Sequence, residues 1–262
     1  MELNEDKIVN EKAWDSRAKQ QQRFTKTADR EAYEKASHVL AQQAWLEGAV
    51  YGKTVLLLAS GGGGQSGLFA SQGAKVTVVD ISSAMLLNDQ ALAKEKQFDI
   101  QVLHTSMDDL SALEDDFFDV VIHPVSTCYL KNISKVYSEV ARVCKSGAVY
   151  ISHHKQPASL QSSQFPDKKG YYLETPLDHS GPLPVVKGSM CREEGTLEYV
   201  HSWESLLGEL CRAGFVIEDL VEPKHGDKKA EVGSFAHRNR FLPTFVSVKA
   251  VKKQKSVKKI II

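Results

Sequence analysis

The apolar residues of this chain gather in seven short runs that predict buried strands. Helical periodicity separates the first five runs, which favours parallel pairing because each helix returns the chain to the same edge of the sheet. The last two runs are joined by a polar, non-helical loop, so we expect them to pair antiparallel. The predicted strands are Thr54–Leu58, Lys75–Val79, Ile100–His104, Asp119–His123, Ala148–Ser152, Phe215–Val221 and Thr244–Val251; the predicted helices are Gly64–Gln72, Ser82–Lys96, Ile133–Val143 (capped by Gly147) and Ser202–Arg212.

This pattern predicts an α/β fold: a seven-stranded sheet, mostly parallel with an antiparallel C-terminal strand, and helices on both faces. In a chain of 262 residues, residues 51–262 suffice for one such domain. After the fifth strand, residues 155–200 are rich in proline, glycine and tyrosine and too long for a plain connector, so we interpret them as an insertion that caps a substrate. Residues 1–50 are predicted to form an N-terminal helical lid segment, with an amphipathic helix at Asp29–Gly48 and a mobile polar stretch at Trp14–Thr27.

Glycines follow the first predicted strand directly and open the first predicted helix. The apolar run that begins at Val55 ends in four consecutive glycines, Gly61–Gly64, and glycine lets the backbone approach a ligand closely. Asp80 ends the second apolar run about twenty residues on, where a carboxylate accepts hydrogen bonds from ribose hydroxyls. Together they indicate an adenosine-containing cofactor. A nicotinamide-dependent oxidoreductase carries a similar turn and stays an alternative.

Charge and cysteine content narrow the class of protein. Lys plus Arg equal Asp plus Glu at 33 each, so no overall field favours nucleic acid or an anionic membrane, and a small-molecule substrate fits better. The four cysteines are far apart without a Cys-x-x-Cys pair, which argues against a zinc site or a disulfide framework. No apolar run approaches the ~20 residues of a membrane span. We expect a cytoplasmic protein, either a monomer or a homodimer.

Several stretches carry a resemblance to a known family. The five βα units with an antiparallel finish resemble the class I S-adenosylmethionine-dependent methyltransferases, and three stretches resemble a bacterial group of the small-molecule type. This implies a Rossmann-like sheet, S-adenosyl-L-methionine as cofactor and S-adenosyl-L-homocysteine as product. The sequence departs from the family pattern at Leu57, where an acidic residue is usual, and at Ala59, where the first glycine is usual. The stretches are Val55–Gly63, Val79–Ser82, Phe118–Ile122 and Ala141–Gly147 for the family, and Ala59–Gly63, His123–Ser126 and Leu242–Phe245 for the bacterial group.

The resemblance also implies which residues hold the cofactor. The turn formed by Ala59, Ser60, Gly61, Gly62 and Gly63 would run along its methionine part. Asp80 would hold the ribose, Ile81 and Met85 would pack on the adenine, and Met107 and Asp108 would enclose the adenine and accept from its amino group. Asp108 could equally cap a short helix that follows it.

Three histidines are candidates for the base that an oxygen or nitrogen acceptor needs. His123 ends the fourth predicted strand, and Pro124 keeps it extended toward the crevice where open α/β sheets bind ligands. His153 and His154 follow the fifth strand, and one of them should face the same crevice because side chains alternate along a strand. The alternatives are that His123 only walls the cofactor site and that His153 and His154 begin a solvated loop. The histidine spacing matches no compact metal motif, so no metal is expected.

Aromatic residues and a further histidine are candidates for substrate contacts, since rings supply large apolar surfaces. They are Trp14, Tyr129, Tyr172, His201 and Trp203. The leading hypothesis is therefore methyl transfer from S-adenosylmethionine to an oxygen or nitrogen of a small molecule, such as a specialised metabolite. The alternatives are a non-catalytic protein that binds S-adenosylmethionine or S-adenosylhomocysteine, and an NAD-dependent oxidoreductase.

Overall fold

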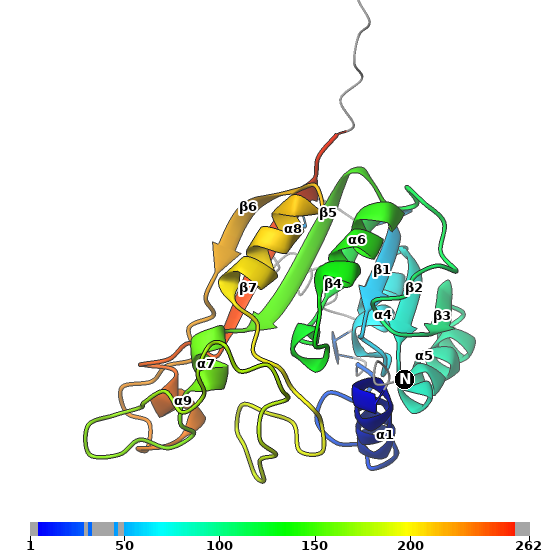
Figure 1. Cartoon of the computed structure of the whole chain (residues 1–262). Coiled ribbons are helices and arrows are strands. Elements are labelled where there is room, and N and C mark those ends of the chain that lie inside the picture. The colour runs from blue at the N-terminus through cyan, green and yellow to red at the C-terminus, as the bar shows by residue number, and fades with distance from the viewer. Residues whose placement is uncertain (1–4, 29–30, 33–44, 47–49, 255–262) are drawn as a thin grey trace, which may run out of the picture.

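A seven-stranded sheet forms the centre of the computed structural model, which describes residues 5–28, 31–32, 45–46 and 50–254 (Figure 1). The strand order is β3-β2-β1-β4-β5-β7-β6. The first five strands pair in parallel, and β7 pairs antiparallel with both β5 and β6. This confirms the predicted Rossmann-like fold. The strands are β1 (Thr54–Leu58), β2 (Lys75–Asp80), β3 (Ile100–His104), β4 (Phe118–His123), β5 (Cys144–Lys155), β6 (Phe215–Val221) and β7 (Phe245–Lys252).

Helices cover both faces of the sheet, and the apolar run of β1 explains why. Leu56 and Leu58 pack into a core cluster with α6 and α8, whereas Val55 and Leu57 pack into a second cluster with α4 and α5. Successive side chains of a strand point to opposite faces, so a strand covered on both sides is apolar throughout. The helices are α4 (Gly64–Ser71), α5 (Ser83–Lys96), α6 (Ser134–Val143) and α8 (Glu209–Arg212), which continues the π-helical turn η3 (Glu204–Gly208).

The fifth strand differs from its prediction at both ends. It begins at Cys144, directly after α6, and runs to Lys155. Gly147, with φ 81°, lies inside the strand where the register against β4 shifts, so its assignment as a helix cap was wrong. The extension at the other end places His153 and His154 within the sheet rather than in a loop.

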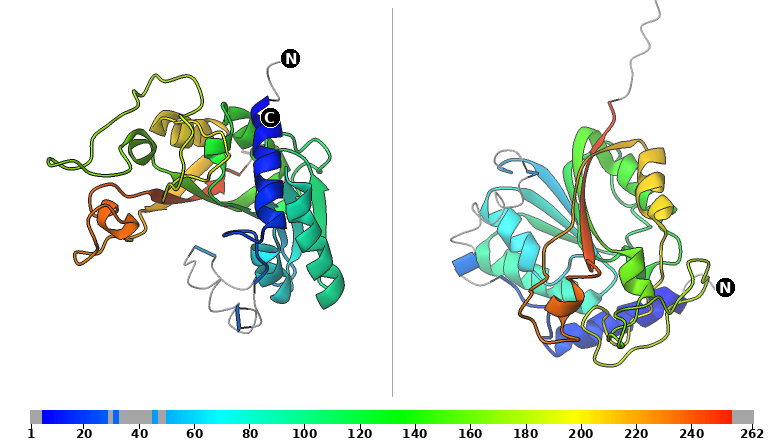
Figure 2. Two further views of the ribbon diagram at one scale, coloured as in Figure 1. Left: turned by 90° about the horizontal axis from the view of Figure 1, so that it is seen from below. Right: turned by 90° about the vertical axis from the view of Figure 1, so that its left-hand side faces the viewer.

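Helix α1 (Glu5–Lys19) corrects the prediction of a mobile segment beginning at Trp14. Ten of its fifteen residues are polar or charged, and only Asn10 and Ala18 are buried. Long-range polar contacts hold it instead: Asp15 accepts hydrogen bonds from Ser82 Oγ at 2.6 Å and from Ala84 N–H at 3.1 Å. The helix lies across the carboxyl ends of the parallel strands (Figure 2). The helix predicted at Asp29–Gly48 falls almost entirely outside the described residues.

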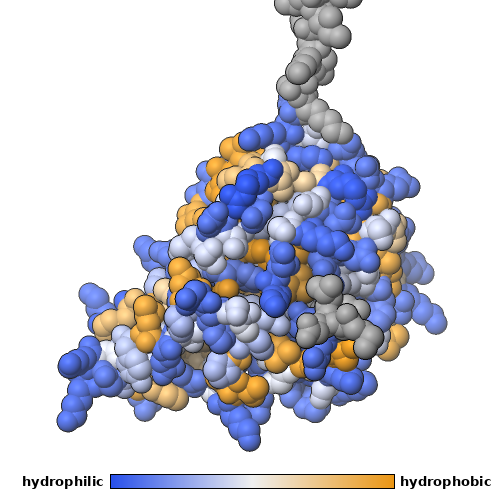
Figure 3. All heavy atoms as spheres, in the orientation of Figure 1, coloured by the Kyte–Doolittle hydropathy of each residue, from blue (hydrophilic) through white to orange (hydrophobic). Residues whose placement is uncertain are grey.

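The segment after β5 extends away from the sheet beside the β6–β7 connection (Figure 1). It contains α7 (Pro157–Gln161), and the connection contains α9 (Phe235–Arg238). The fully buried Arg238 guanidinium joins the two, donating to Ser159 O at 2.7 Å and to Ser163 O at 3.2 Å. Apolar and polar side chains are interspersed over the face that Figure 3 shows.

Candidate functional site

A cavity of about 650 Å³ opens at the carboxyl ends of the strands. Crevices outside these ends are where open α/β sheets bind ligands. One end of the cavity lies at the glycine turn and at the loops after β2 and β3. The other end lies between α1, the 3₁₀ turn η2 (Thr127–Tyr129), and the ends of β5 and β7. A single cavity therefore joins the predicted cofactor residues to a second compartment. This second part, at Trp14, Tyr129, His153 and Phe245, is called the deep compartment below.

The turn after β1 has a backbone that only small residues allow. Gly62 and Gly63 have φ of 112° and 81°, and Ala59 takes the left-handed conformation at 46°. A Cβ on Gly61 would lie 2.7 Å from Met85 Cβ and 3.1 Å from Asp80 Oδ2. The turn is thus pressed against the start of α5, and it leaves the backbone of Ala59, Ser60 and Gly61 lining the cavity.

Asp80 lies at the end of β2 and lines the cavity while only 7% exposed. Its Oδ2 accepts the N–H of Gly61 at 2.8 Å, and its Oδ1 accepts the N–H of Ser82 at 2.8 Å. Burial raises the pKa of this carboxyl, and the two backbone hydrogen bonds oppose that rise. Since an ionised carboxylate oxygen has more than one acceptor site, both oxygens retain capacity for a ligand hydroxyl.

Asp89 on α5 is a second buried carboxyl at the turn, and the sequence analysis missed it. It accepts the N–H groups of Gly62 at 2.8 Å and Gly63 at 3.0 Å, together with the Ser66 hydroxyl. Burial raises its pKa to about 6, against the opposing hydrogen bond from Ser66. An acidic residue in the apolar register of a helix, three positions after Leu86 and three before Leu92, was the signal in the sequence.

Most of the residues that were predicted to contact the adenine lie together. Ile81, Met85 and Met107 line the cavity, whereas Asp108 binds Lys7 Nζ of α1 at 2.7 and 2.8 Å and is not among the lining residues. Burial opposes its charge, but hydrogen bonds from Lys7 and Ser106 outweigh that effect and lower the pKa of Asp108. Turns follow Asp108, so the alternative that it caps a short helix is wrong.

The alternation of β5 separates its two histidines. His153 lines the cavity, and its Nδ1 lies 2.7 Å from Ser247 Oγ on β7. His154 points to the other face, where it is fully buried between Thr127 Oγ1 at 3.0 Å and Ser152 Oγ at 2.8 Å. Burial lowers the pKa of both rings. The alternative of a solvated loop is therefore wrong for both.

His123 is fully buried and is not among the residues that line the cavity. Its Nδ1 lies 2.7 Å from the Tyr150 hydroxyl and its Nε2 lies 2.8 Å from Ser126 Oγ. Burial lowers its pKa to about 3. The ring is neutral with both nitrogens occupied by protein, while Pro124, Val125 and Ser126 after it form the cavity wall.

Two of the predicted substrate residues meet in the deep compartment. Trp14 of α1 and Tyr129 of η2 line it with their rings edge to face, 5.9 Å between centroids. Tyr172 and Trp203 are 50% and 41% exposed and lie outside the cavity, because the insertion that carries Tyr172 extends away from the sheet. His201 is buried, and its Nε2 lies 3.0 and 2.9 Å from the carbonyls of Thr127 and Leu130, so it supports η2.

Lys155 and Glu193 also line the deep compartment, and the sequence analysis missed both. Lys155 is the last residue of β5, and Glu193 comes from the insertion. They form an ion pair at 2.6 Å, although 38 residues separate them. No sequence pattern signals such a pairing. Within the described ranges, no group of three or more His, Cys, Asp or Glu residues could hold a metal ion, and no helix is long and apolar enough to cross a membrane.

Comparison with known proteins identifies the family. The family model described as a methyltransferase domain matches residues 56–152. An uncharacterized methyltransferase of Bacillus subtilis, YbaJ, is 30% identical over 231 residues, covering 83% of this chain and 90% of that protein. The S-adenosylmethionine-dependent methyltransferase of Mesorhizobium loti has a similar fold, with a TM-score of 0.64 at 21% identity over 84% of this chain and 100% of that one. Geranyl diphosphate C-methyltransferase of Streptomyces coelicolor also shares the fold, with a TM-score of 0.59 at 15% identity over 83% and 80% of the two chains. The chain belongs to the class I S-adenosylmethionine-dependent methyltransferases.

Proposed function

We propose that this enzyme transfers the methyl group of S-adenosylmethionine to an oxygen or nitrogen atom of a small-molecule acceptor. The observation that carries this proposal is the single cavity of about 650 Å³ that runs from the glycine turn to His153. Its volume lies within the ~300–1,000 Å³ of small-molecule sites. In this proposal the cofactor occupies the end at the turn, and the acceptor occupies the deep compartment.

The residues at the turn suit the cofactor. Asp80 would accept the ribose hydroxyls, since both of its oxygens keep acceptor capacity. The backbone of Ala59, Ser60 and Gly61 would run along the methionine part, with Gly62 and Gly63 shaping the turn behind it. Ile81, Met85 and Met107 offer the apolar walls that a planar adenine needs. Asp108, which pairs with Lys7 of α1, would also accept a hydrogen bond from the adenine amino group.

His153 is our proposed base. The bound cofactor supplies a methyl group on a sulfonium, so the protein must chiefly align the nucleophile and exclude water. Burial lowers the pKa of His153, which favours the neutral ring, and within the described structure only its Nδ1 has a hydrogen-bond partner. Its Nε2 is then the atom that takes the proton of an acceptor hydroxyl or amine. His123 would hold the cavity wall in place through Ser126, and His154 would hold η2 in place through Thr127.

We propose that two segments cover the acceptor. Residues 1–50 contribute α1, whose Asn10 and Trp14 line the cavity, and the insertion at 155–200 contributes Glu193. Both come from outside the part of the chain that the methyltransferase family model matches. Acceptor specificity would therefore reside in two segments that lie outside the matched methyltransferase core.

Turnover with labelled cofactor tests the proposal. The enzyme is incubated with methyl-tritiated S-adenosylmethionine and a native small-metabolite extract, and labelled products are separated by chromatography. We expect label on an acceptor through a methyl ether or methylamine, and loss of that label with His153→Gln. Binding of S-adenosylmethionine and S-adenosylhomocysteine without transfer to any component would instead support the non-catalytic alternative.

A further inference from the structure

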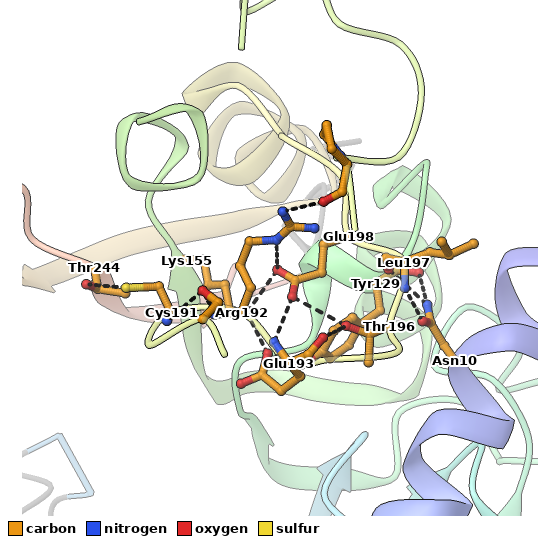
Figure 4. Close-up of polar contacts among 12 residues, drawn as sticks. Asn10, Tyr129, Lys155, Cys191, Arg192, Glu193, Thr196, Leu197, Glu198 and Thr244 are labelled. Carbon is orange, nitrogen blue, oxygen red and sulfur yellow. Dashed lines mark hydrogen bonds and ion pairs between the residues drawn. The ribbon is translucent and has the colours of Figure 1, made fainter. Parts of the chain in front are cut away.

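The deep compartment contains a buried charged cluster that the proposed mechanism does not use. Lys155 Nζ lies 2.6 Å from Glu193 Oε2 and 2.9 Å from Glu198 Oε2, and the three side chains are 1%, 17% and 0% exposed (Figure 4). The Tyr129 hydroxyl donates to the same Glu193 Oε2 at 2.9 Å. Glu193 thus has one oxygen fixed from two sides and is the carboxylate of the cluster that lines the cavity.

The cluster pairs two cations with two carboxylates, because Arg192 Nε also lies 3.7 Å from Glu198 Oε2. Glu198 is fully buried beside the ammonium and also accepts the backbone N–H of Glu193 at 3.2 Å. A buried ion pair is costly unless its geometry is good, and a second carboxylate adds to the charge that must be desolvated. Glu193 stays ionised nonetheless: burial opposes its charge, but Lys155 and the Tyr129 hydroxyl outweigh that effect and lower its pKa. The cluster therefore keeps an ionised carboxylate at the cavity wall.

Apart from Lys155 and the Arg17 charge, both of which help to lower the pKa of Glu193, the surroundings of this residue are apolar and aromatic. Trp14, Tyr129, Val125, Leu130 and Phe245 line the same compartment. The Lys155 ammonium is already held by two carboxylates, so it is not free to bind an anion. A carboxylate only accepts hydrogen bonds, and it does so strongly from a hydroxyl or N–H when water is excluded.

We infer that the methyl acceptor is a mainly apolar ring compound with a hydroxyl or amino group, which Glu193 anchors as a hydrogen-bond acceptor. Trp14 and Tyr129 supply the ring surfaces, and Lys155 and Tyr129 hold the Glu193 carboxylate in place. Glu193 is in this respect a specificity-determining residue, and compounds that carry a carboxylate or phosphate at this position are excluded. The inference rests on the proposed function, because it assigns the deep compartment to the acceptor.

Binding to the complex with S-adenosylhomocysteine tests the inference without turnover. The probes are naphthalene, 2-naphthol, 2-naphthylamine and 2-naphthoate, and dissociation constants are measured by ligand-observed NMR. We expect 2-naphthol and 2-naphthylamine to bind about ten times more tightly than naphthalene, and 2-naphthoate to bind most weakly. Glu193→Gln should weaken the first two about 10-fold and leave naphthalene unchanged. Glu194→Gln, the same change at the exposed neighbouring residue, should alter none of them.

Four outcomes would overturn the inference. Tightest binding of 2-naphthoate would assign an anion to this position, and failure of all four probes to bind would exclude a ring compound. An equal loss for naphthalene in Glu193→Gln would make the residue structural, and no loss for 2-naphthol would remove its anchoring role. If Glu193→Gln fails to fold, Tyr129→Phe removes the hydroxyl that orients the carboxylate and should weaken 2-naphthol a few-fold relative to naphthalene. Failure of the proposed function appears separately, as absence of methyl transfer with the probe-binding pattern intact.

Discussion

Asp89 fixes the cofactor turn through three hydrogen bonds, and Asp89→Asn would separate its charge from its shape. The asparagine has nearly the same size, but one of its two terminal atoms is a donor. That donor would face either the N–H of Gly62 or the two donors on the other oxygen, which are the N–H of Gly63 and the Ser66 hydroxyl. Because Asp89 is 0% exposed, no solvent can take over the lost bond.

Two opposing effects set the change in the free energy of unfolding that Asp89→Asn causes. A buried N–H left without a partner costs about 1–3 kcal/mol. Against this, the asparagine need not ionise, whereas a rise of the Asp89 pKa from 3.8 to about 6 corresponds to about 3 kcal/mol at neutral pH. The effects nearly cancel, so Asp89→Asn should change the free energy of unfolding at pH 7.5 by less than about 2 kcal/mol. The affinity for S-adenosylmethionine should nevertheless fall about 10-fold, a loss of about 1.4 kcal/mol, because the turn loses one fixed amide.

The pH dependence distinguishes this reasoning from a simple loss of packing. The Asp89 pKa is 3.8 in the unfolded chain and about 6 in the folded protein. Between these two values the folded protein keeps a proton that the unfolded chain has released, so the contribution of Asp89 to stability falls as the pH rises through this window. From pH 4.5 to pH 7.5 the stability of the wild type should fall by about 2 kcal/mol relative to Asp89→Asn. Urea unfolding at several pH values measures it, with Glu95→Gln on the exposed side of α5 as the control. A difference that does not change with pH would refute the assignment.

Three further predictions concern residues in and near the cavity. Asp80→Asn should raise the dissociation constant for S-adenosylmethionine about 10- to 100-fold in calorimetry, because an amide accepts from fewer hydroxyls than a carboxylate. His153→Gln should lower kcat about 10²- to 10⁴-fold with little change in cofactor affinity, and wild-type kcat should start to fall at a lower pH than it would for an ordinary histidine, since burial lowers the pKa of His153. His123→Ala should lower the free energy of unfolding by about 2–4 kcal/mol, because it leaves a buried cavity and unpaired partners at Tyr150 and Ser126; a large loss of turnover with unchanged stability would restore it as a catalytic candidate.

The core was predictable because local pattern and tertiary environment agree there. The apolar run at Val55–Leu58 and the glycines after it match a strand buried on both faces and a close turn. Helix α1 was not predictable from periodicity, because its residues face partners distant in sequence, such as Asp15 with Ser82. The two histidines of β5 show most clearly what the sequence alone cannot predict. Strand alternation required that His153 and His154 face opposite ways, but only the pairing with β7, which places Ser247 opposite His153, decides which of them lines the cavity.

Helix α1 touches both ends of the cavity at once. Lys7 pairs with Asp108 on the proposed cofactor side, and Asn10 donates to the Tyr129 carbonyl at 3.1 Å on the proposed acceptor side. A helix that spans both proposed ligand sites would link them thermodynamically, since whatever orders it at one end reduces the entropic cost of ordering it at the other. We therefore expect the affinities for cofactor and acceptor to be coupled with positive sign and reciprocally.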